Sequence, residues 1–166
     1  MAGEAYVVKG TPLLISGVAG ANYAWSVEGL VNAAGRTSAQ IDLGVAPRPA
    51  NFHWSCKVQW QATPVAGRGI SLYIATAPDD ASTQIDGNVG VSDAALSTLL
   101  RRVNLRYIGS VLSYDAVASV DCIQSGTFEC TERYLSLVAV NNAGSAVDAT
   151  DSNFVFKLTP IYWQGQ

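Results

Sequence analysis

The stretch FHWSCKVQWQ, residues 52–61, decides the fold class. Its aromatic and aliphatic side chains stand at every second position, with polar side chains between them. Successive side chains of a β-strand point to opposite faces of a sheet, so a period of two predicts a strand with one buried and one wetter face. The buried face would carry Phe52, Trp54, Cys56, Val58 and Trp60, and the other face His53, Ser55, Lys57, Gln59 and Gln61.

Further strands are predicted along the rest of the chain. ISLYIAT (70–76) alternates in the same way, whereas RYLSLVAV (133–140) has apolar side chains on both faces and should be covered on both sides. One short helix is predicted over SDAALSTLLRR (92–102), because Ser92 is a suitable N-cap and apolar residues follow it at helical spacing. Weaker strand candidates, separated by Gly-, Pro- and Asn-rich turns, are residues 22–28, 37–43, 104–112, 118–124 and 153–159.

About eight short strands joined by turns are typical of an all-β, two-sheet sandwich. We favour a jelly roll with one short helix over an immunoglobulin-like domain, because the Cys–Trp–Cys spacing of the latter is absent. The closing strand, 153–159, is expected to pair in the middle of a sheet and so to resist fraying. The bulky core candidates are Trp25, Trp54, Trp60 and Phe156.

The chain has 166 residues, which is the length of one domain. We expect the jelly roll to span residues 21–166, preceded by an N-terminal arm over residues 1–20, in which Gly and Pro recur. Only 14% of the residues are charged, against about 25% in a typical domain. A surface with so few charges is easily desolvated, which favours contact with another protein.

Neither nucleic acid nor a membrane is expected as a partner. The formal net charge is −3, whereas a nucleic-acid footprint is normally basic. No segment approaches the roughly 20 consecutive apolar residues of a membrane-spanning helix. No signal peptide is evident, and we expect synthesis in a cytoplasm.

The sequence offers little for catalysis. Three cysteines are an odd number, so they favour small buried thiols over a disulfide framework, although Cys122 and Cys130 could pair across a turn. His53 is the one imidazole. Positions three apart in a strand face opposite sides, so His53 and Cys56 cannot form a nucleophile–base pair or share a metal. We therefore expect no enzyme activity, no cofactor and no metal site.

Four aspartates near one loop raise the question of calcium. Asp79, Asp80, Asp86 and Asp93 lack the alternating oxygen ligands and the closing Glu of an EF-hand. A loop site of another kind stays open, but turn residues are the simpler interpretation, since Asp86 precedes a glycine.

Two groups of side chains are candidates for an interface with a partner protein or with further copies of the chain. The first is the basic cluster Arg101, Arg102 and Arg106. Arginine is favoured at interfaces because its planar fork pairs with carboxylates and stacks on rings. The second is the terminal aromatic pair Tyr162 and Trp163, which is costly to leave in water. The alternative for the arginines is that they form a solvated edge. The alternative for Tyr162 and Trp163 is that they are buried against their own domain.

Segments of the second half of the chain resemble a known family. GISLYIATA (69–77), SDAALSTLLRRVNLRYIGSV (92–111), RYLSLVAVNNAGSAV (133–147) and FKLTPIYWQ (156–164) follow one another in this order. This arrangement resembles the jelly-roll decoration, or cement, proteins on the heads of tailed bacteriophages, in which a strand ending in VVxN and an LTPI terminus recur. The resemblance covers roughly residues 69–166.

The resemblance implies a structural role in the virion. It implies a protein made in the host cytoplasm that sits on the outer capsid surface as a dimer or trimer. There it would bridge subunits of the major capsid protein and stabilise the shell without any chemical step. It implies no cofactor.

Two other function classes remain open from the sequence. A carbohydrate- or receptor-binding virion fibre module would gather exposed rings, such as Tyr107, Tyr114 and Trp163, on one concave face. An enzyme would use loop carboxylates such as Asp79, Asp80 and Asp86.

Overall fold

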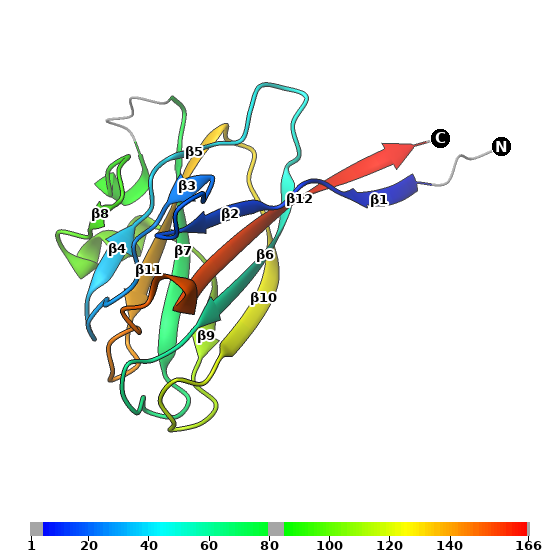
Figure 1. Cartoon of the computed structure of the whole chain (residues 1–166). Helices are drawn as coiled ribbons and strands as arrows, with labels where there is room; N and C mark the ends of the chain where they lie inside the picture. The colour runs from blue at the N-terminus through cyan, green and yellow to red at the C-terminus, as the bar shows by residue number, and fades with distance from the viewer. Residues whose placement is uncertain (1–4, 80–84, 166) are drawn as a thin grey trace.

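Most of the stretch that decides the fold class forms β6 (Asn51–Val58), within a jelly-roll sandwich of two six-stranded sheets (Figure 1). The strand is shorter than predicted, since Trp60 forms only an isolated bridge with Val147. The computed structural model describes residues 5–79 and 85–165. The first sheet has the order β10 (Cys122–Glu129), β6, β12 (Phe154–Gly165), β2 (Leu13–Ser16) and β3 (Tyr23–Ala24), with β1 (Ala5–Lys9) paired to β12. The second has the order β8 (Ala94–Ala95), β4 (Gly35–Thr37), β11 (Tyr134–Asn141), β7 (Gly69–Ala77) and β9 (Arg106–Leu112), with β5 (Ile41–Asp42) paired to β11.

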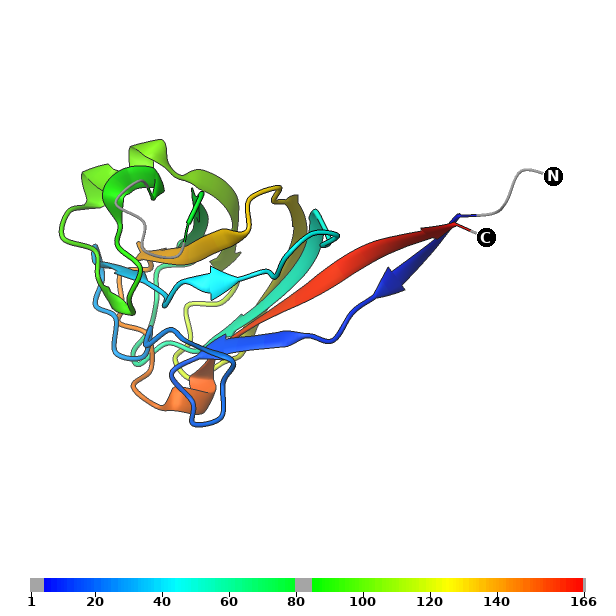
Figure 2. The ribbon, with the colours of Figure 1, turned by 90° about the horizontal axis from the view of Figure 1, so that it is seen from above.

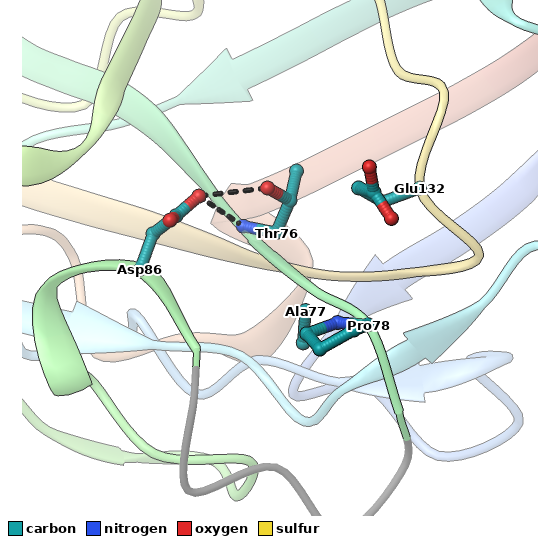
Figure 3. Close-up of a pocket in the computed structure, with 5 residues that line it drawn as sticks. All are labelled: Thr76, Ala77, Pro78, Asp86 and Glu132. Atoms are coloured by element: carbon teal, nitrogen blue, oxygen red, sulfur yellow. Dashed lines mark hydrogen bonds between the residues drawn. The ribbon is translucent and has the colours of Figure 1, made fainter.

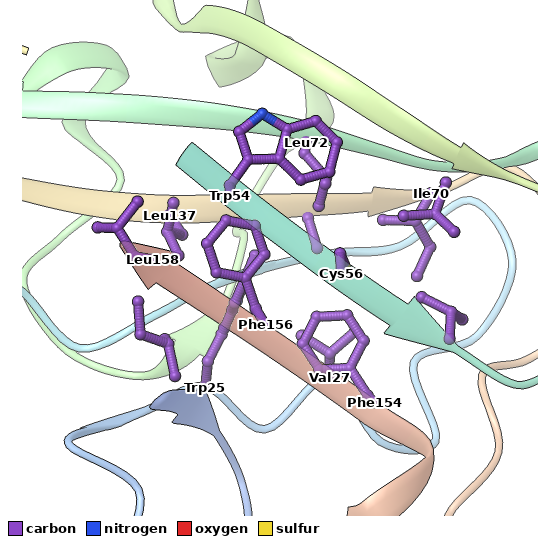
Figure 4. Close-up of a cluster of buried hydrophobic side chains, with 14 of the residues drawn as sticks. Trp25, Val27, Trp54, Cys56, Ile70, Leu72, Leu137, Phe154, Phe156 and Leu158 are labelled. Carbon is purple, nitrogen blue, oxygen red and sulfur yellow. The ribbon is translucent and has the colours of Figure 1, made fainter. Parts of the chain in front are cut away.

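The predicted core is confirmed. Trp25, Trp54, Trp60 and Phe156 are all buried between the sheets. The Trp54 and Phe156 rings stack with their centroids 6.0 Å apart, and the edge of Trp25 meets the same Phe156 ring at 5.6 Å (Figure 4). Aromatic pairs in such offset or edge-to-face arrangements contribute beyond the area that they bury. The alternation of β6 therefore supplies the centre of the core.

β12 lies in the middle of the first sheet, as predicted for the closing strand. It pairs with β6 from Phe154 opposite Val58 to Ile161 opposite Asn51, and with β2 on its other side. Backbone groups paired on both sides have no need of water, so this part of the strand is held by the core rather than frayed.

β11 is buried on both faces, as its apolar pattern predicts. One face meets the first sheet, and the other is covered by the segment 85–105, which crosses the outside of the second sheet. This segment includes two short 3₁₀-helices, η1 (Asp86–Asn88) and η2 (Leu99–Asn104). A second apolar cluster results, made of Ala75, Ala77, Ile85, Val89, Leu96, Leu105, Val138 and Val140.

The helix predicted over residues 92–102 has different bounds and a different type. Residues 94–95 form β8 against β4, and the helical turn, η2, begins only after Thr98, whose Oγ1 accepts a hydrogen bond from Leu100 N. Ser92 is therefore not the cap. Pairing with the neighbouring strand overrides the local helical pattern.

The structure has more strands than the eight or so predicted, because several strands are too short to show an alternating pattern in the sequence. Residues 37–43 contain the end of β4 and, separately, β5, and the strands β1, β2 and β8 were not predicted. The arm expected over residues 1–20 is divided in the structure. Leu13–Ser16 belongs to the sandwich, whereas Ala5–Lys9 pairs with the part of β12 that leaves it. A third 3₁₀-helix, η3 (Asp151–Asn153), precedes β12.

The cysteines are as expected. Cys56, Cys122 and Cys130 are buried and free, so the alternative of a disulfide between the last two is wrong. Burial raises the pKa of the Cys56 thiol far above its ordinary value, which keeps it protonated and inert.

The Trp54 ring fills the space between the edge strands β9 and β10, and two glycines make room for it. A Cβ at Gly126 would lie 2.8 Å from Trp54 Nε1, and one at Gly109 would lie 2.4 Å from Trp54 Cζ2. A buried indole stacked on Phe156 has nowhere to move.

We therefore expect Gly126→Ala to lower the free energy of unfolding by about 1–3 kcal/mol, the usual cost of overpacking a core. Urea unfolding followed by circular dichroism measures this as a lower midpoint with an unchanged slope. Ser125→Ala, at the exposed neighbouring position of β10, is the control and should unfold like the wild type. Equal stability of the two variants would contradict the close packing of Trp54 against Gly126.

Candidate functional site: a projecting ribbon and its base

The two chain ends form a two-stranded ribbon that projects from the sandwich (Figure 2). β12 continues past its last pair with β6 at Ile161, and from there β1 is its partner. The register places Val7 opposite Trp163 and Val8 opposite Tyr162. An isolated pair of strands is marginally stable in water, so contact with a partner would stabilise this ribbon.

Each face of the ribbon exposes apolar side chains, with Lys9 beside Val7 at the base. Residues directly opposite one another in an antiparallel pair share a face, so Val7 and Trp163 lie on one face and Val8 and Tyr162 on the other. The exposed fractions are 54% and 67% for the first pair and 37% and 41% for the second. Covering what each side chain exposes is worth on the order of 1 kcal/mol.

Two hollows flank the base of the ribbon. One of about 410 Å³, here called the Trp163 hollow, lies between residues 47–51 and residues 161–163. The other, of about 350 Å³, is called the Leu43 hollow and includes Leu13, Leu43 and Phe52 in its lining. Pro49 and Tyr162 line both. The ribbon and the loop 44–50 thus border shared hollows, in which apolar side chains lie beside Arg48 and Asp42; this surface is called the ribbon site.

Charged contacts hold the loop 44–50 in place. Arg133 donates from Nε to Asp42 Oδ1 at 2.8 Å and from Nη2 to Asp42 Oδ2 at 2.7 Å. Gly44 N donates to the same Oδ1 at 2.8 Å, and Arg48 donates to the carbonyl oxygen of Thr131 farther along the loop. The side-chain hydrogen bonds from Arg133 lower the pKa of Asp42 to about 2. The rim of the Leu43 hollow is therefore fixed by an ion pair.

The five predicted interface residues fall into two separate groups. Tyr162 and Trp163 are exposed on the ribbon, and burial of this pair against its own domain is wrong. Arg101 and Arg102 lie in η2, at the end of the body away from the ribbon (Figures 1 and 2). Arg106 opens β9, donates to the carbonyl oxygen of Glu129 and lies over the Phe128 ring.

The loop aspartates serve separate local contacts. Asp86 accepts from Thr76 N at 2.9 Å and Thr76 Oγ1 at 2.7 Å, beside a small hollow that Glu132 also lines (Figure 3). Asp93 accepts from Ser26 and Arg36, and these bonds lower its pKa although burial alone would raise it. Asp80 lies outside the described residues, and within them no three potential ligands gather as a metal site.

His53 and the candidate sugar-binding rings are dispersed. His53 lies on the outer face of β6, opposite the buried side of Cys56. Tyr107 stands near the start of β9 against Tyr73, and Tyr114 lies beyond the other end of the same strand. Trp163 is on the ribbon, so the structure does not bring the three rings to one surface. In the described part of the chain, no helix is long and apolar enough to span a membrane.

No protein-family model and no curated protein sequence matches the chain. Among solved structures it is similar to the C-terminal domain of the sugar-binding protein EclA, at 12% identity and a TM-score of 0.35, over 97% of this chain and 79% of that one. It is also similar to the CBM22-1–GH10 modules of Clostridium thermocellum endo-1,4-beta-D-xylanase 10B, complexed with xylohexaose, at 12% identity and a TM-score of 0.38. That match covers 93% of this chain and 26% of the other. Similarity at this level does not extend to function.

Sequence reasoning missed part of the ribbon site. Val7 and Val8 carried a weak signal, since adjacent β-branched residues favour a strand. The loop 44–50 was recognised only as a turn, because nothing local reveals that it lies beside the C-terminal residues.

Asp42→Asn should weaken the acid dependence of stability. The folded-state pKa of Asp42 lies below its unfolded value, so its contribution is present above about pH 4 and is lost as the pH falls toward 2. The variant should therefore be less stable than the wild type at pH 7, by less than about 1 kcal/mol because the pair is exposed. Most of the difference should be lost by about pH 2, and the remainder below it.

Urea unfolding between pH 2 and pH 7 measures this dependence. Asp115→Asn is the control, since it removes an exposed carboxylate that forms no ion pair within the described residues. A constant difference between Asp42→Asn and the wild type at every pH would show that the ion pair is not its source.

Proposed function

We propose that the chain is a head decoration, or cement, protein of a tailed bacteriophage, which binds the outer capsid surface, bridges major capsid subunits and stabilises the shell. The observation that carries the proposal is the projecting ribbon with apolar side chains exposed on both faces. The resemblance of residues 69–166 to decoration proteins names the class of partner. We expect synthesis in the host cytoplasm, residence in the virion and self-association as a dimer or trimer.

The two-faced ribbon favours a bridging role. A flat partner surface can cover Val7 and Trp163 or Val8 and Tyr162, but not both pairs. Covering both requires a cleft, and the junction between two neighbouring subunits supplies one. A protein that fits this junction only in the expanded shell stabilises that state by mass action, because it binds one state and not the other.

The free energy of such a contact is modest for one copy. The four ribbon side chains and the two hollows together amount to less than a standard interface of about 800 Å² per partner. Copies that self-associate would engage several subunits together, and linked contacts gain from their high effective concentration. Stabilisation of the shell thus needs many copies and no chemical step.

The proposal is tested with purified shells that lack the protein. Adding the wild type should raise the temperature at which shells open and their resistance to osmotic shock. Val7→Ser/Trp163→Ser should bind at least about tenfold more weakly, a loss of about 1.4 kcal/mol or more, and should protect the shells correspondingly less. Val31→Ser is the matched control, since Val31 is a similarly exposed valine on the body. Shells that resist heat and osmotic shock equally with and without the wild type would overturn the proposal.

A second candidate is a carbohydrate- or receptor-binding virion fibre module. One observation favours it, namely that the exposed Trp163 indole borders a hollow of about 410 Å³. It predicts binding on a glycan array that Trp163→Ala abolishes and Val31→Ser preserves. An array without binding by the wild type would remove this candidate.

A further inference from the structure

Among the side chains that the structure describes, the two most exposed large apolar ones lie together on η2. Leu100 is 78% exposed and Val103 is 76% exposed. A 3₁₀-helix has three residues per turn, so residues at i and i+3 stand directly in line. Leu100 and Val103 therefore rise from one face of η2, away from the second sheet.

The orientation of η2, and with it the exposure of this face, is fixed by contacts with the rest of the domain. Leu105 is buried in the second apolar cluster directly after η2, and Leu99 packs against the same cluster from the start of η2. Arg101 donates to the carbonyl oxygen of Asn88 in η1. Gly87 fits closely beneath, since a Cβ there would lie 2.7 Å from the Arg101 carbonyl oxygen. The exposure of Leu100 and Val103 is thus built into the fold.

Arg101 and Arg102 stand between the two residues of this pair in the sequence, and Arg106 follows at the start of β9. Arg101, Arg102 and Arg106 are three of the ten Lys and Arg residues in the chain. Arg101 and Arg106 donate to backbone carbonyl oxygens, and neither forms an ion pair among the described residues. Arg102 stands in line with Leu99, on the side of η2 next to the Leu100 and Val103 face. It is exposed and has no side-chain partner among the described residues. Guanidinium groups remain charged at every physiological pH.

We propose that Leu100, Arg102 and Val103, the η2 patch, form a second docking surface for an acidic protein surface of the shell. That surface would offer carboxylates to Arg102 beside an apolar recess for Leu100 and Val103. The inference rests on the proposed function for the identity of the partner, but it concerns a different part of the molecule.

The charge of the η2 patch distinguishes between a second copy of the chain, a nucleic acid and an acidic protein surface as its partner. In a two-fold contact with the patch on the symmetry axis, Arg102 would lie near Arg102 of the second copy, which is repulsive. A nucleic acid would require a larger basic footprint than three arginines on a chain of net charge −3. A protein surface rich in carboxylates satisfies both the charge and the apolar pair.

The test measures binding of labelled protein to purified shells that lack it, at low and high salt. Leu100→Ser/Val103→Ser and Arg102→Glu should each weaken binding at least about tenfold, and Arg102→Glu should also reduce its salt dependence. Arg68→Glu and Val117→Ser are controls at exposed positions elsewhere, and should bind within about twofold of the wild type. Circular dichroism confirms that each variant is folded.

The outcomes separate the two proposals. If the wild type binds shells and the η2 variants bind equally well with the same salt dependence, the η2 patch is not a docking surface and the proposed function stands. If the wild type does not bind shells, both proposals fail. Native mass spectrometry without shells gives the third outcome, because a change of oligomeric state in Leu100→Ser/Val103→Ser would assign the patch to a second copy and overturn the inference.

Discussion

The structure depends on one strand that is longer than the sandwich to which it belongs. β12 begins between β6 and β2, where its alternate side chains Phe154, Phe156 and Leu158 enter the core. Beyond Ile161 it extends past the end of β6 and pairs with β1. The same continuous backbone therefore holds the core and projects the ribbon. A rigid core fixes the direction in which the ribbon leaves, which gives an otherwise marginal pair of strands a defined geometry.

The sequence predicted the parts of this fold in which one face of a strand is buried and the other is wet. The alternation of β6 is visible because the core buries Trp54 and Cys56 while solvent wets Ser55. The ribbon has no such contrast, since both of its faces expose apolar side chains, and a period of two cannot appear. In the segment 92–102, Leu96 and Leu99 face the second sheet while Leu100 faces solvent. Their spacing resembles a helical stripe, but a strand pair at Ala94–Ala95 interrupts it.

The candidate site was predictable by residue type and not by arrangement. Low charge and a terminal aromatic pair indicated an interface, and Tyr162 and Trp163 are indeed exposed. The arginines are a different matter, because only the tertiary structure reveals that η2 and the ribbon lie at opposite ends of the molecule. The ion pair between Asp42 and Arg133 spans 91 positions in the sequence, so local patterns could not predict it either. Local patterns identify the kinds of groups that bind, and long-range pairing decides which of them act together.

Two docking surfaces on opposite ends of a rigid body would have a consequence that neither has alone. Each surface offers only a few apolar side chains, so each contact by itself is weak. A body held by a continuous aromatic core keeps the two surfaces at a fixed separation, and the second contact then forms at high effective concentration only where the partner sites have the same spacing. A shell whose subunits move apart on expansion would present that spacing in one state and not in the other. Selectivity for the expanded shell would then follow from the stiffness of the sandwich, and the ribbon site and the η2 patch would need no particular strength of their own.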